Sequence, residues 1–511
     1  MHSLIRPDRS WLLCLVAVTF WCSPLSVLAD GNLSSDWPQF RGRAASGLAD
    51  GPPPPAKWDV ETGENILWKA DIPGLGHASP IVSRGHIFVV TALSENSDLR
   101  IGLYGDIAPV DDDSEHDWRL LCLSQTSGRI LWERSLHVGV PTIKRHTKAS
   151  HANSTPATDG HHVVTMLASE GLFCHDFAGN LIWKRDLGTL DSGFFMVPDA
   201  QWGFAASPII HKGRVIIQAD VQKDSFLAAL DVHTGEEIWR TKRTDVPTWS
   251  TPAVARVKNR DVIVVNGFRK SAGYDAADGS EIWSLAGGGD IPVPTPVFGH
   301  GNVYLSSAHG FFRPLRAVRL EVEGAIPLPK LSEKKKPSPH FAWYEAREGI
   351  YQGTPLIYGD NLYACRGNGL LSCFDAKTGE RKFRDRLNSG DSGFTASPVA
   401  AGQRIYFASE SGTVSVVEHG DEFKLLAKNY MQSYCMATPA ISHGVLYVRT
   451  NKALYAIGKP TQHALAKTSR PVVRCQVAQC RPCRCCRCVR RRQPKKSGVI
   501  SRVWRRLFGC R

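Results

Sequence analysis

Short apolar runs that alternate with polar residues recur along the chain, and turn residues separate them. In ALDVHTGEEIWR, residues 229–240, one run ends near Asp231, a turn carries Thr234-Gly235, and a second run carries Trp239. A period of two residues is typical of a strand with one buried face. Asp hydrogen-bonds backbone amides in turns, and Gly adopts positive φ without a Cβ penalty. The pattern therefore predicts a β-hairpin with a short loop.

Close copies of this hairpin appear throughout the sequence. They are DVETGENILWK ending at Lys69, CLSQTSGRILWER ending at Arg134, CHDFAGNLIWKR ending at Arg185, GYDAADGSEIWS ending at Ser284 and CFDAKTGERKFR ending at Arg384. A Ser/Thr-Pro pair and a further apolar run precede the hairpins, with prolines at 80, 156, 208, 252, 296, 355, 398 and 439. Most spacings between these prolines fall between 41 and 52 residues. Units of this length built from four short strands are propeller blades.

The closing strands of these units decide how many blades there are. They carry Trp132, Trp183, Trp239, Trp283, Trp343, Phe383 and a weak match near Leu425. The last unit starts at Pro439 and stops near Gly458 without such a strand, whereas ENILWKADI around Trp68 has no strands before it. Joining the two ends removes an open blade edge. We therefore expect an all-β fold, a single eight-bladed β-propeller over residues 30–458, closed by the N-terminal strand.

Repeat position also indicates roles for the tryptophans and the cysteines. We expect Trp68, Trp132, Trp183, Trp239 and Trp283 to fill equivalent sites between blades. Cys122, Cys174 and Cys373 share their place in the repeat with Ala229 and Gly273, which is typical of a tight buried slot. A two-residue turn at Asn368-Gly369 would pair residue 364 with Cys373 and put Cys365 on the other face. We therefore expect all five propeller cysteines, Cys435 included, to be structural and unpaired.

Net charge divides the chain into two parts. Residues 459–511 hold 16 of the 62 basic residues and no Asp or Glu, so the remainder carries 46 basic and 48 acidic residues. Because the basicity belongs to the tail, the body has no general signature of nucleic-acid binding. The tail also holds six cysteines from Cys475 to Cys488, and Cys510 is a seventh. Disulfides, metal binding and an unstructured tail stay open for this segment.

The first residues resemble an export signal. Arg6 and Arg9 precede the apolar run WLLCLVAVTFWCSPLSVLA, and Val27-Leu28-Ala29 suits cleavage before Asp30. We therefore expect a signal peptide over residues 1–29 and an extracytoplasmic protein, periplasmic or secreted, with a retained membrane anchor as the alternative.

The D-x-x-T-G-x-x-x-W pattern with Ser/Thr-Pro starts resembles the quinoprotein-like (PQQ-like) β-propeller repeat, over residues 37–458. Relatives of that group include quinoprotein dehydrogenases and BamB-type outer-membrane assembly proteins. WPQFRG at 37–42 and HTKASHANSTPATDG at 146–160 are similar to secreted propellers of planctomycete-type bacteria. The resemblance implies a fold, whereas function does not follow because one scaffold hosts many activities.

Two branches of this resemblance imply features that are incomplete here. The dehydrogenases carry an adjacent cysteine pair in the propeller, a Ca²⁺ held by acidic and amide side chains, and a catalytic Asp. In this chain the adjacent pair is Cys485-Cys486, in the tail, and no blade loop offers a recognisable Ca²⁺ set. We therefore expect no cofactor, with PQQ and Ca²⁺ as the alternative. The assembly proteins are lipid-anchored, and this sequence lacks their lipobox.

One cluster of cations and imidazoles falls where a propeller has its channel. IKRHTKASH, residues 143–151, lies just before the second blade, and the segment that leads into an inner strand lies beside the central channel. Such a cluster suits an anionic ligand or a peptide carboxylate, and a solvated loop is the alternative. The candidate channel residues here and at equivalent blade starts are Arg145, His146, Lys148, His151, Gln201, Trp202, Trp249 and Tyr434.

The remaining motifs do not indicate a specific binding or catalytic site. The insertion DIAPVDDDSEHD, residues 106–117, alternates Asp113, Glu115 and Asp117, but it lacks EF-hand spacing. We expect a solvated acidic loop there, with Ca²⁺ binding as the alternative. No nucleophile elbow, P-loop, HExxH or dinucleotide fingerprint appears in a fitting sequence context.

Three classes of function remain open for this sequence. The first is a non-catalytic scaffold outside the cytoplasm that binds a protein or envelope component. The second is an enzyme, either a PQQ-dependent oxidoreductase or one with an unrecognised site. The third is an envelope protein crosslinked through its tail. Nucleic acid is an improbable partner for an exported chain, and the oligomeric state is open.

The end of the tail generates a prediction about membranes. In residues 499–511, Ile500, Val503, Trp504, Leu507 and Phe508 have helical spacing, and arginines fall on the other side. We expect this amphipathic helix to bind an anionic membrane surface. In flotation assays at low salt, the full chain should float with anionic liposomes, and a chain ending at Gly458 should not. Equal flotation of the two would contradict the prediction.

Overall fold

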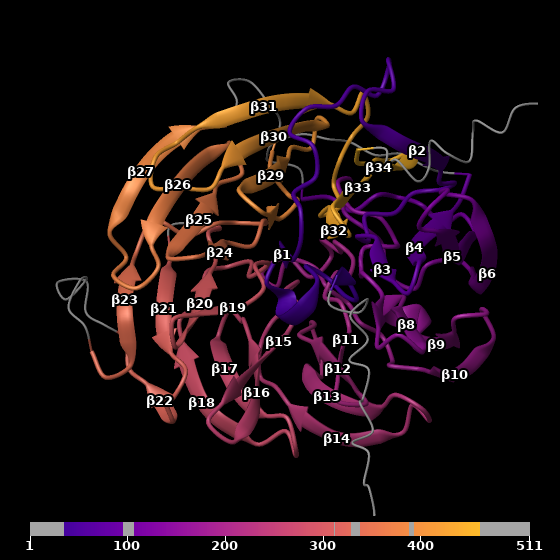
Figure 1. Cartoon of the computed structure of the whole chain (residues 1–511). Coiled ribbons are helices and arrows are strands. Elements are labelled where there is room, and N and C mark those ends of the chain that lie inside the picture. Colours follow the sequence, from indigo (N-terminus) through magenta and orange to yellow (C-terminus); the bar gives the residue numbers. More distant parts are fainter. Residues whose placement is uncertain (1–34, 96–106, 311, 329–337, 388–392, 460–511) are drawn as a thin grey trace, which may run out of the picture. The chain divides into compact units, whose positions relative to one another are not determined.

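Eight sheets surround a central axis, and each contains four antiparallel strands in up-and-down order, to which two of the sheets add a fifth, parallel strand (Figure 1). The middle strands of each sheet are buried on both faces because neighbouring sheets cover them. The outermost strand alternates between exposed and half-buried residues, as in β14 (Glu237–Lys242). The eight-bladed propeller predicted from the repeats is therefore confirmed.

The first four blades are β3–β6 (Ile81–Ser83, His86–Leu93, His116–Ser124, Ile130–Gly139), β7–β10 (Ala157–Thr158, His162–Met166, Leu172–Asp176, Leu181–Arg185), β11–β14 (Ile209–His211, Arg214–Ala219, Phe226–Asp231, Glu237–Lys242) and β15–β18 (Ala253–Val257, Arg260–Val265, Lys270–Asp275, Glu281–Ala286). Blades 5 to 7 are β19, β20, β21 and β23 (Val297–Gly299, Asn302–Ser306, Leu315–Arg319, Phe341–Glu345), β24–β27 (Leu356–Tyr358, Asn361–Cys365, Leu370–Asp375, Arg381–Arg386) and β28–β31 (Val399–Ala401, Arg404–Ala408, Thr413–Glu418, Leu425–Tyr430). Blade 8 is β32–β34 (Ala440–Ser442, Val445–Arg449, Ala453–Ile457) with β2 (Ile66–Asp71). The described helical segments are two 3₁₀ turns, η2 (Arg43–Ala45) and η3 (Ala168–Glu170).

This computed structural model describes residues 35–95, 107–310, 312–328, 338–387 and 393–459. All of them lie in one unit, Met1–Pro460. The predicted signal peptide, the cysteine-rich tail and the predicted amphipathic helix lie outside the described residues. Within the described ranges, no helix is both long and apolar enough to cross a bilayer.

The N-terminal strand closes the ring, as predicted. Strand β2 pairs antiparallel with β34, which places Trp68 opposite Ala456. The Trp68 indole donates a 3.1 Å hydrogen bond to the carbonyl of Gln125 in blade 1. Blade 8 is therefore completed by residues from the two ends of the propeller sequence and bonded to blade 1.

The closing tryptophans occupy equivalent places, each opposite a small residue of the neighbouring strand. Trp183 pairs with Cys174, Trp239 with Ala229 and Trp283 with Gly273, and a β-bulge follows each pair. Pairing a large ring with a small residue keeps the two side chains within the space between blades. The weak match expected near Leu425 is at Ala427, which lies opposite Val416 beside the same bulge in blade 7.

The rings of Trp183 and Trp239 pack against the turn glycine of the following blade. A Cβ atom at Gly235 would lie 2.6 Å from the ring of Trp183, and one at Gly279 would lie 2.5 Å from the ring of Trp239. Both glycines have positive φ. The Trp183 indole also donates a 2.8 Å hydrogen bond to the Val232 carbonyl in that next blade. The repeated Thr-Gly and Trp are thus two halves of one contact between blades.

Blade 4 is the exception to this contact. Strand β22 (Gly324–Ile326), in the insertion of blade 5, pairs parallel with β18 alongside Trp283. The Trp283 side chain is 1% exposed, and its indole N–H has no partner within the described ranges. The insertion therefore replaces the turn that receives the tryptophan in the other blades, and the buried site is kept.

The five propeller cysteines are buried and unpaired, as predicted. Burial raises the pKa of the Cys122, Cys174 and Cys435 thiols to about 12, so they stay protonated and unreactive. The predicted face of Cys365 is wrong. The loop spans residues 366–369, so Cys365 pairs with Leu371 and lies on the same face as Cys373, in one core cluster.

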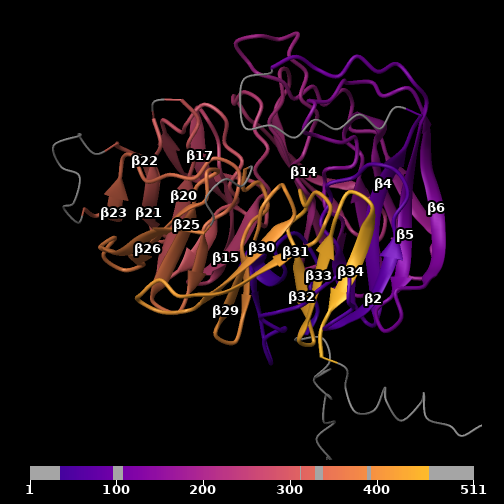
Figure 2. The ribbon, with the colours of Figure 1, turned by 90° about the horizontal axis from the view of Figure 1, so that it is seen from above.

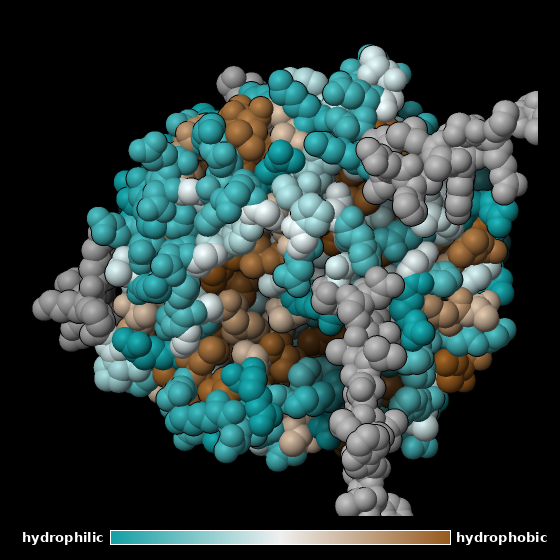
Figure 3. All heavy atoms as spheres, in the orientation of Figure 1, coloured by the Kyte–Doolittle hydropathy of each residue, from teal (hydrophilic) through white to brown (hydrophobic). Residues whose placement is uncertain are grey.

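Residues 35–58, which we call the strap, cross one end of the ring. Trp37 exchanges backbone hydrogen bonds with Val82 in blade 1. Farther along, β1 (Leu48–Ala49) pairs parallel with β28 in blade 7. Figure 1 shows the strap, in indigo, in front of the centre of the ring, and Figure 3 shows apolar residues gathered around the centre of this face. Purple and magenta connections rise from the opposite end of the ring (Figure 2).

Arg41 anchors the strap. Its fully buried guanidinium donates to the carbonyls of Ala45, Ser46, Pro355 and Pro398, so it joins the strap to blades 6 and 7. Burial lowers the pKa of Arg41 to about 9, so the side chain is still a cation at neutral pH. The segment WPQFRG therefore fixes the strap to the ring, a structural role that the sequence analysis did not predict.

The packing of Trp183 generates a stability prediction. The side chain is 6% exposed, and Trp→Ala changes at buried positions cost about 3–5 kcal/mol. We expect Trp183→Ala to lower the free energy of unfolding by that amount in urea titrations. Ile182→Ala, at the adjacent and exposed position, should cost under about 1 kcal/mol. Equal losses in the two variants would contradict the contact between blades described above.

Candidate functional site

A cavity of about 470 Å³ lies where the blade starts converge around the axis of the ring. Seven of the eight Ser/Thr residues that precede the marker prolines line it: Ser79, Thr155, Ser207, Thr251, Thr354, Ser397 and Thr438. Phe40 lines it from the strap. A cavity of this size suits a small ligand or the end of a longer one.

These Ser/Thr residues, with Thr295, form what we call the hydroxyl ring. The backbone N–H of Ser79 donates to the Thr155 hydroxyl at 2.9 Å, and the N–H of Thr155 donates in turn to Ser207 at 2.9 Å. Four further links of the same kind join blades 3 to 4, 5 to 6, 6 to 7 and 7 to 8. Because these hydroxyls accept the neighbouring amide, their own protons remain available to donate.

One ion pair crosses the cavity between residues far apart in sequence. The Lys148 ammonium lies 2.7 Å from Oε1 of Glu410 in blade 7, and the Thr395 hydroxyl lies 2.5 Å from the same oxygen. The Glu410 side chain is 1% exposed, and its Oε2 atom has no partner in the described part of the chain. A buried carboxylate oxygen without a partner is costly, so this atom is a natural point of contact for a ligand donor.

Aromatic rings form much of the cavity wall. Trp202 and Trp249 lie with ring centroids 5.7 Å apart, and Phe194 stacks on Trp202 at 5.5 Å. The Trp202 indole N–H donates to the Ile107 carbonyl and that of Trp249 to the Gly203 carbonyl. Since both N–H groups are used, the two tryptophans present only ring surface to a ligand. Tyr351 and His309 add a second aromatic pair, 5.3 Å apart, from blade 5 and the start of blade 6.

His77 is the most perturbed titratable group in the cavity lining. Burial, then the Arg449 and Arg145 cations, lower its pKa to about 3. The imidazole is therefore neutral at physiological pH. Its backbone N–H bonds to the Ala152 carbonyl and the Ser150 hydroxyl, which fixes blade 1 against blade 2.

The eight candidate residues predicted from sequence divide into two groups. His146, Lys148, Trp202 and Trp249 line the cavity. The other four are placed elsewhere: Arg145, His151, Gln201 and Tyr434.

Each of those four has a different environment. Arg145 and His151 line a separate small cavity with His116. Burial, then His116 and Arg145, lower the pKa of His151 to about 3. The Gln201 amide oxygen accepts from the Lys144 backbone N–H, and Tyr434 is 44% exposed beside Asn451.

The acidic insertion does not gather its carboxylates at one point. Asp112 is buried and accepts from the Ser114 hydroxyl at 2.5 Å, whereas Asp117 pairs with Arg119 at 2.6 Å. Asp111 pairs with Lys144 at 2.5 Å. The expectation of a solvated loop is therefore wrong for Asp112, which packs toward His116 near the second cavity.

Sequence reasoning missed the groups that pair with the predicted ones. Glu410 lies in the connection between β29 and β30, in the unremarkable stretch ASESG, 262 residues from Lys148. Tyr351, Gln352 and Thr395 come from the connections into blades 6 and 7. For Gln352 and Thr395 the repeat was the available signal, because each stands two residues before the Ser/Thr of its blade, as Trp249 does before Thr251.

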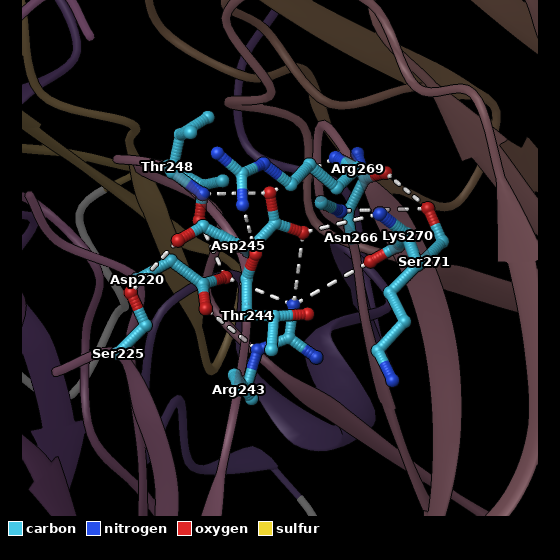
Figure 4. Close-up of polar contacts among 12 residues, drawn as sticks. Asp220, Ser225, Arg243, Thr244, Asp245, Thr248, Asn266, Arg269, Lys270 and Ser271 are labelled. Atoms are coloured by element: carbon cyan, nitrogen blue, oxygen red, sulfur yellow. Dashed lines mark hydrogen bonds and ion pairs between the residues drawn. The ribbon is translucent and has the colours of Figure 1, made fainter.

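A second polar cluster is buried between blades 3 and 4 (Figure 4). Arg243 donates to Asp220 at 2.6 Å and to Asp245 at 3.3 Å, and all three side chains are fully buried. Burial, then the Asp220 charge, raises the pKa of Asp245. The Arg243 guanidinium also bonds to the Tyr274 hydroxyl at 2.8 Å. Because its hydrogen bonds run between strands and turns of the two blades, this cluster holds blades together.

The cavity lining has few of the groups that the quinoprotein resemblance implies for a cofactor site. PQQ is a polyanion, and the one lysine of the lining is already paired with Glu410. Among the described residues, no group of three or more His, Cys, Asp or Glu side chains could hold a metal ion. The other polar groups of the lining are mainly hydroxyls, and its apolar surface includes aromatic ring faces.

The neutral state of His77 generates a pH prediction. The unfolded chain takes up a proton at this side chain below pH 6.5, whereas the folded chain does so only near pH 3. Stability conferred by the neutral imidazole is therefore lost as the pH falls through this window. Between pH 7 and pH 5, His77→Asn should lose about 2 kcal/mol less unfolding free energy than the wild type. Urea unfolding at both pH values tests this, with exposed His443→Asn as the control; identical losses would contradict it.

Comparison with known proteins places the chain in a family. The family model described as "Outer membrane protein assembly factor BamB" matches residues 116–321 and 345–422, more than half of the chain. A curated relative of that name from Burkholderia pseudomallei is 29% identical over 102 residues, which span 20% of this chain and 26% of the relative. The matched part is thus about a quarter of the relative's length.

Solved structures share the propeller. The quinohemoprotein alcohol dehydrogenase from Comamonas testosteroni superposes with a TM-score of 0.56 and 11% identity, covering 85% of this chain and 82% of that one. BamB from Moraxella catarrhalis superposes with a TM-score of 0.47 and 14% identity, covering 72% of this chain and 100% of that one. At 11% identity the dehydrogenase match shows the fold alone. The repeat pattern, the closed ring and the family match together show that this chain belongs to the family of the outer membrane protein assembly factor BamB.

Proposed function

We propose that this protein is a non-catalytic, extracytoplasmic binding propeller. It presents the open end of its central cavity to a protein or an envelope component. The observation that carries the proposal is the cavity itself. Its lining has a paired cation and anion, aromatic ring faces and hydroxyl groups, which are groups that bind a ligand.

The family supports a binding role. The family name refers to an assembly factor for outer-membrane proteins, and a factor that assembles proteins has to bind them. The predicted signal peptide over residues 1–29 supports export, in agreement with the outer-membrane reference in that name. A rigid ring suits such a role because its loops are held at fixed distances from one another.

The geometry favours the end opposite the strap for contact. The strap occupies the other end, where Arg41 and Trp37 fix it to blades 1, 6 and 7. Ile107, by contrast, lines the cavity and is 46% exposed. A partner that reaches Ile107 would also reach Trp202, whose indole bonds to the Ile107 carbonyl.

Site-specific photo-crosslinking in the native envelope tests this proposal. A photoreactive residue in place of Ile107 should give a defined adduct. The same residue in place of Ile238, which is 43% exposed on the outer strand β14, should give none. Adducts from Ile238 alone would contradict the proposed face. Dye-linked alcohol oxidation by the purified protein with PQQ and Ca²⁺ would contradict the non-catalytic role.

A further inference from the structure

We propose that the central cavity is a saccharide-binding site that takes the terminal sugar of a neutral glycan, by way of Lys148, Glu410, Trp202 and Trp249. This inference rests on the proposed binding role and names a ligand class for the cavity. Four features carry it: the charge balance, the unused hydrogen-bonding capacity, the aromatic surface, and the hydroxyl ring with the strap at one end.

The charge balance favours a neutral ligand. Apart from its histidines, the lining has one cation and one anion, Lys148 and Glu410, and they pair at 2.7 Å. An anionic ligand would have to compete with Glu410 for the lysine. A cationic ligand would have to compete with the lysine for the carboxylate. Replacing either ionic partner leaves a buried charge uncompensated, so a ligand that accommodates both is favoured.

The same pair has hydrogen bonds left to make. The Lys148 ammonium has three protons, and the contact with Glu410 uses one. Glu410 Oε2 is buried and accepts from no group in the described residues. A donor and an acceptor side by side match two neighbouring hydroxyl groups, one accepting from Lys148 and one donating to Glu410. A vicinal diol of a sugar ring has this arrangement.

The aromatic surface matches the other face of a sugar. Trp202 and Trp249 have both indole N–H groups bonded to backbone carbonyls, so they present C–H and π surface alone. Their planes differ by 34°, and Phe194 backs Trp202 in a parallel stack. A pyranose ring has an apolar C–H face that packs on such surfaces while its edge hydroxyls bond elsewhere. Purely apolar ligands would leave Glu410 Oε2 unpaired, which disfavours them.

The hydroxyl ring and the strap determine how the ligand enters. Seven hydroxyls of that ring line the cavity, and most of them already accept a backbone N–H, so they are oriented to donate to sugar oxygens. The strap crosses one end of the channel, and Phe40 lines the cavity from that side. A glycan therefore enters from the other end, with its terminal unit first. A cyclic oligosaccharide, which has no end, should be excluded.

Titration of the full mature chain with sugars tests the inference. The readouts are tryptophan fluorescence and saturation-transfer difference NMR, and the neutral probes are maltose, cellobiose and N,N′-diacetylchitobiose. We expect at least one to bind, and galacturonate, an anionic sugar, to bind at least about tenfold more weakly. If none of the neutral sugars binds, or if galacturonate binds best, the inference is overturned.

Matched variants locate the site. Glu410→Gln and Lys148→Met should each lower the affinity for the bound sugar at least about tenfold, because each removes a charge-assisted hydrogen bond. Glu236→Gln and Lys242→Met, the same changes at exposed positions, should leave it unchanged. Thermal melts show whether each variant is folded, and Trp249→Leu gives a further variant that disturbs no charge. Equal affinities in the cavity variants and their controls would overturn the inference.

Further experiments test whether a chain end is needed and whether the natural sugar is part of a polymer. They also distinguish failure of the saccharide inference from failure of the proposed binding role. Linear maltoheptaose should bind and β-cyclodextrin should not if the cavity takes a chain end, and binding of both equally would overturn end-first entry. Purified envelope glycans then show whether a polymer competes with the free sugar. If no sugar binds and Ile107 still crosslinks to a protein, the saccharide inference fails while the binding role stands.

Discussion

The blade packing depends above all on one contact, in which a tryptophan of one blade lies against the turn glycine of the next. A single four-stranded blade leaves both of its faces exposed, so it cannot bury its apolar residues alone. The indole of Trp183 spans that gap: it packs on Gly235 and donates to the Val232 carbonyl. This contact recurs at five of the eight blade interfaces, Trp68 against blade 1 included, and there it sets the distance between neighbouring blades.

At the centre of the ring, the regularly arranged blade starts surround a cavity. The hydroxyl ring links successive blade starts by hydrogen bonds from amide to hydroxyl, so the framework is repetitive and rigid. The charged side chains of the cavity are not repeated and come from particular blades: Lys148 lies before blade 2 and Glu410 lies in blade 7. A closed ring can therefore bring together side chains that are far apart in sequence without rearranging any blade, and it can keep them in place for a ligand.

Sequence reasoning was strongest where the information was local and repeated. The blade count, the closure by the N-terminal strand and the buried cysteines follow from periodic patterns, and the structure confirms them. It failed at register at Cys365, because a longer loop moves a residue by one position without altering the apolar pattern. It missed Glu410 and the role of Arg41, because their partners come from other blades and no spacing in the chain reports such contacts.

The most direct test of this account is native-state hydrogen exchange resolved for the amides of the hydroxyl ring, such as Ser79, Thr155 and Ser397. These amides bond to hydroxyls of the next blade, so they exchange only when neighbouring blades separate. If the contacts between blades hold the ring as one body, all of these amides should exchange with one common free energy, equal to that of global unfolding. Amides that exchange with different free energies from blade to blade would contradict the account, because the central cavity would then not be a preformed site.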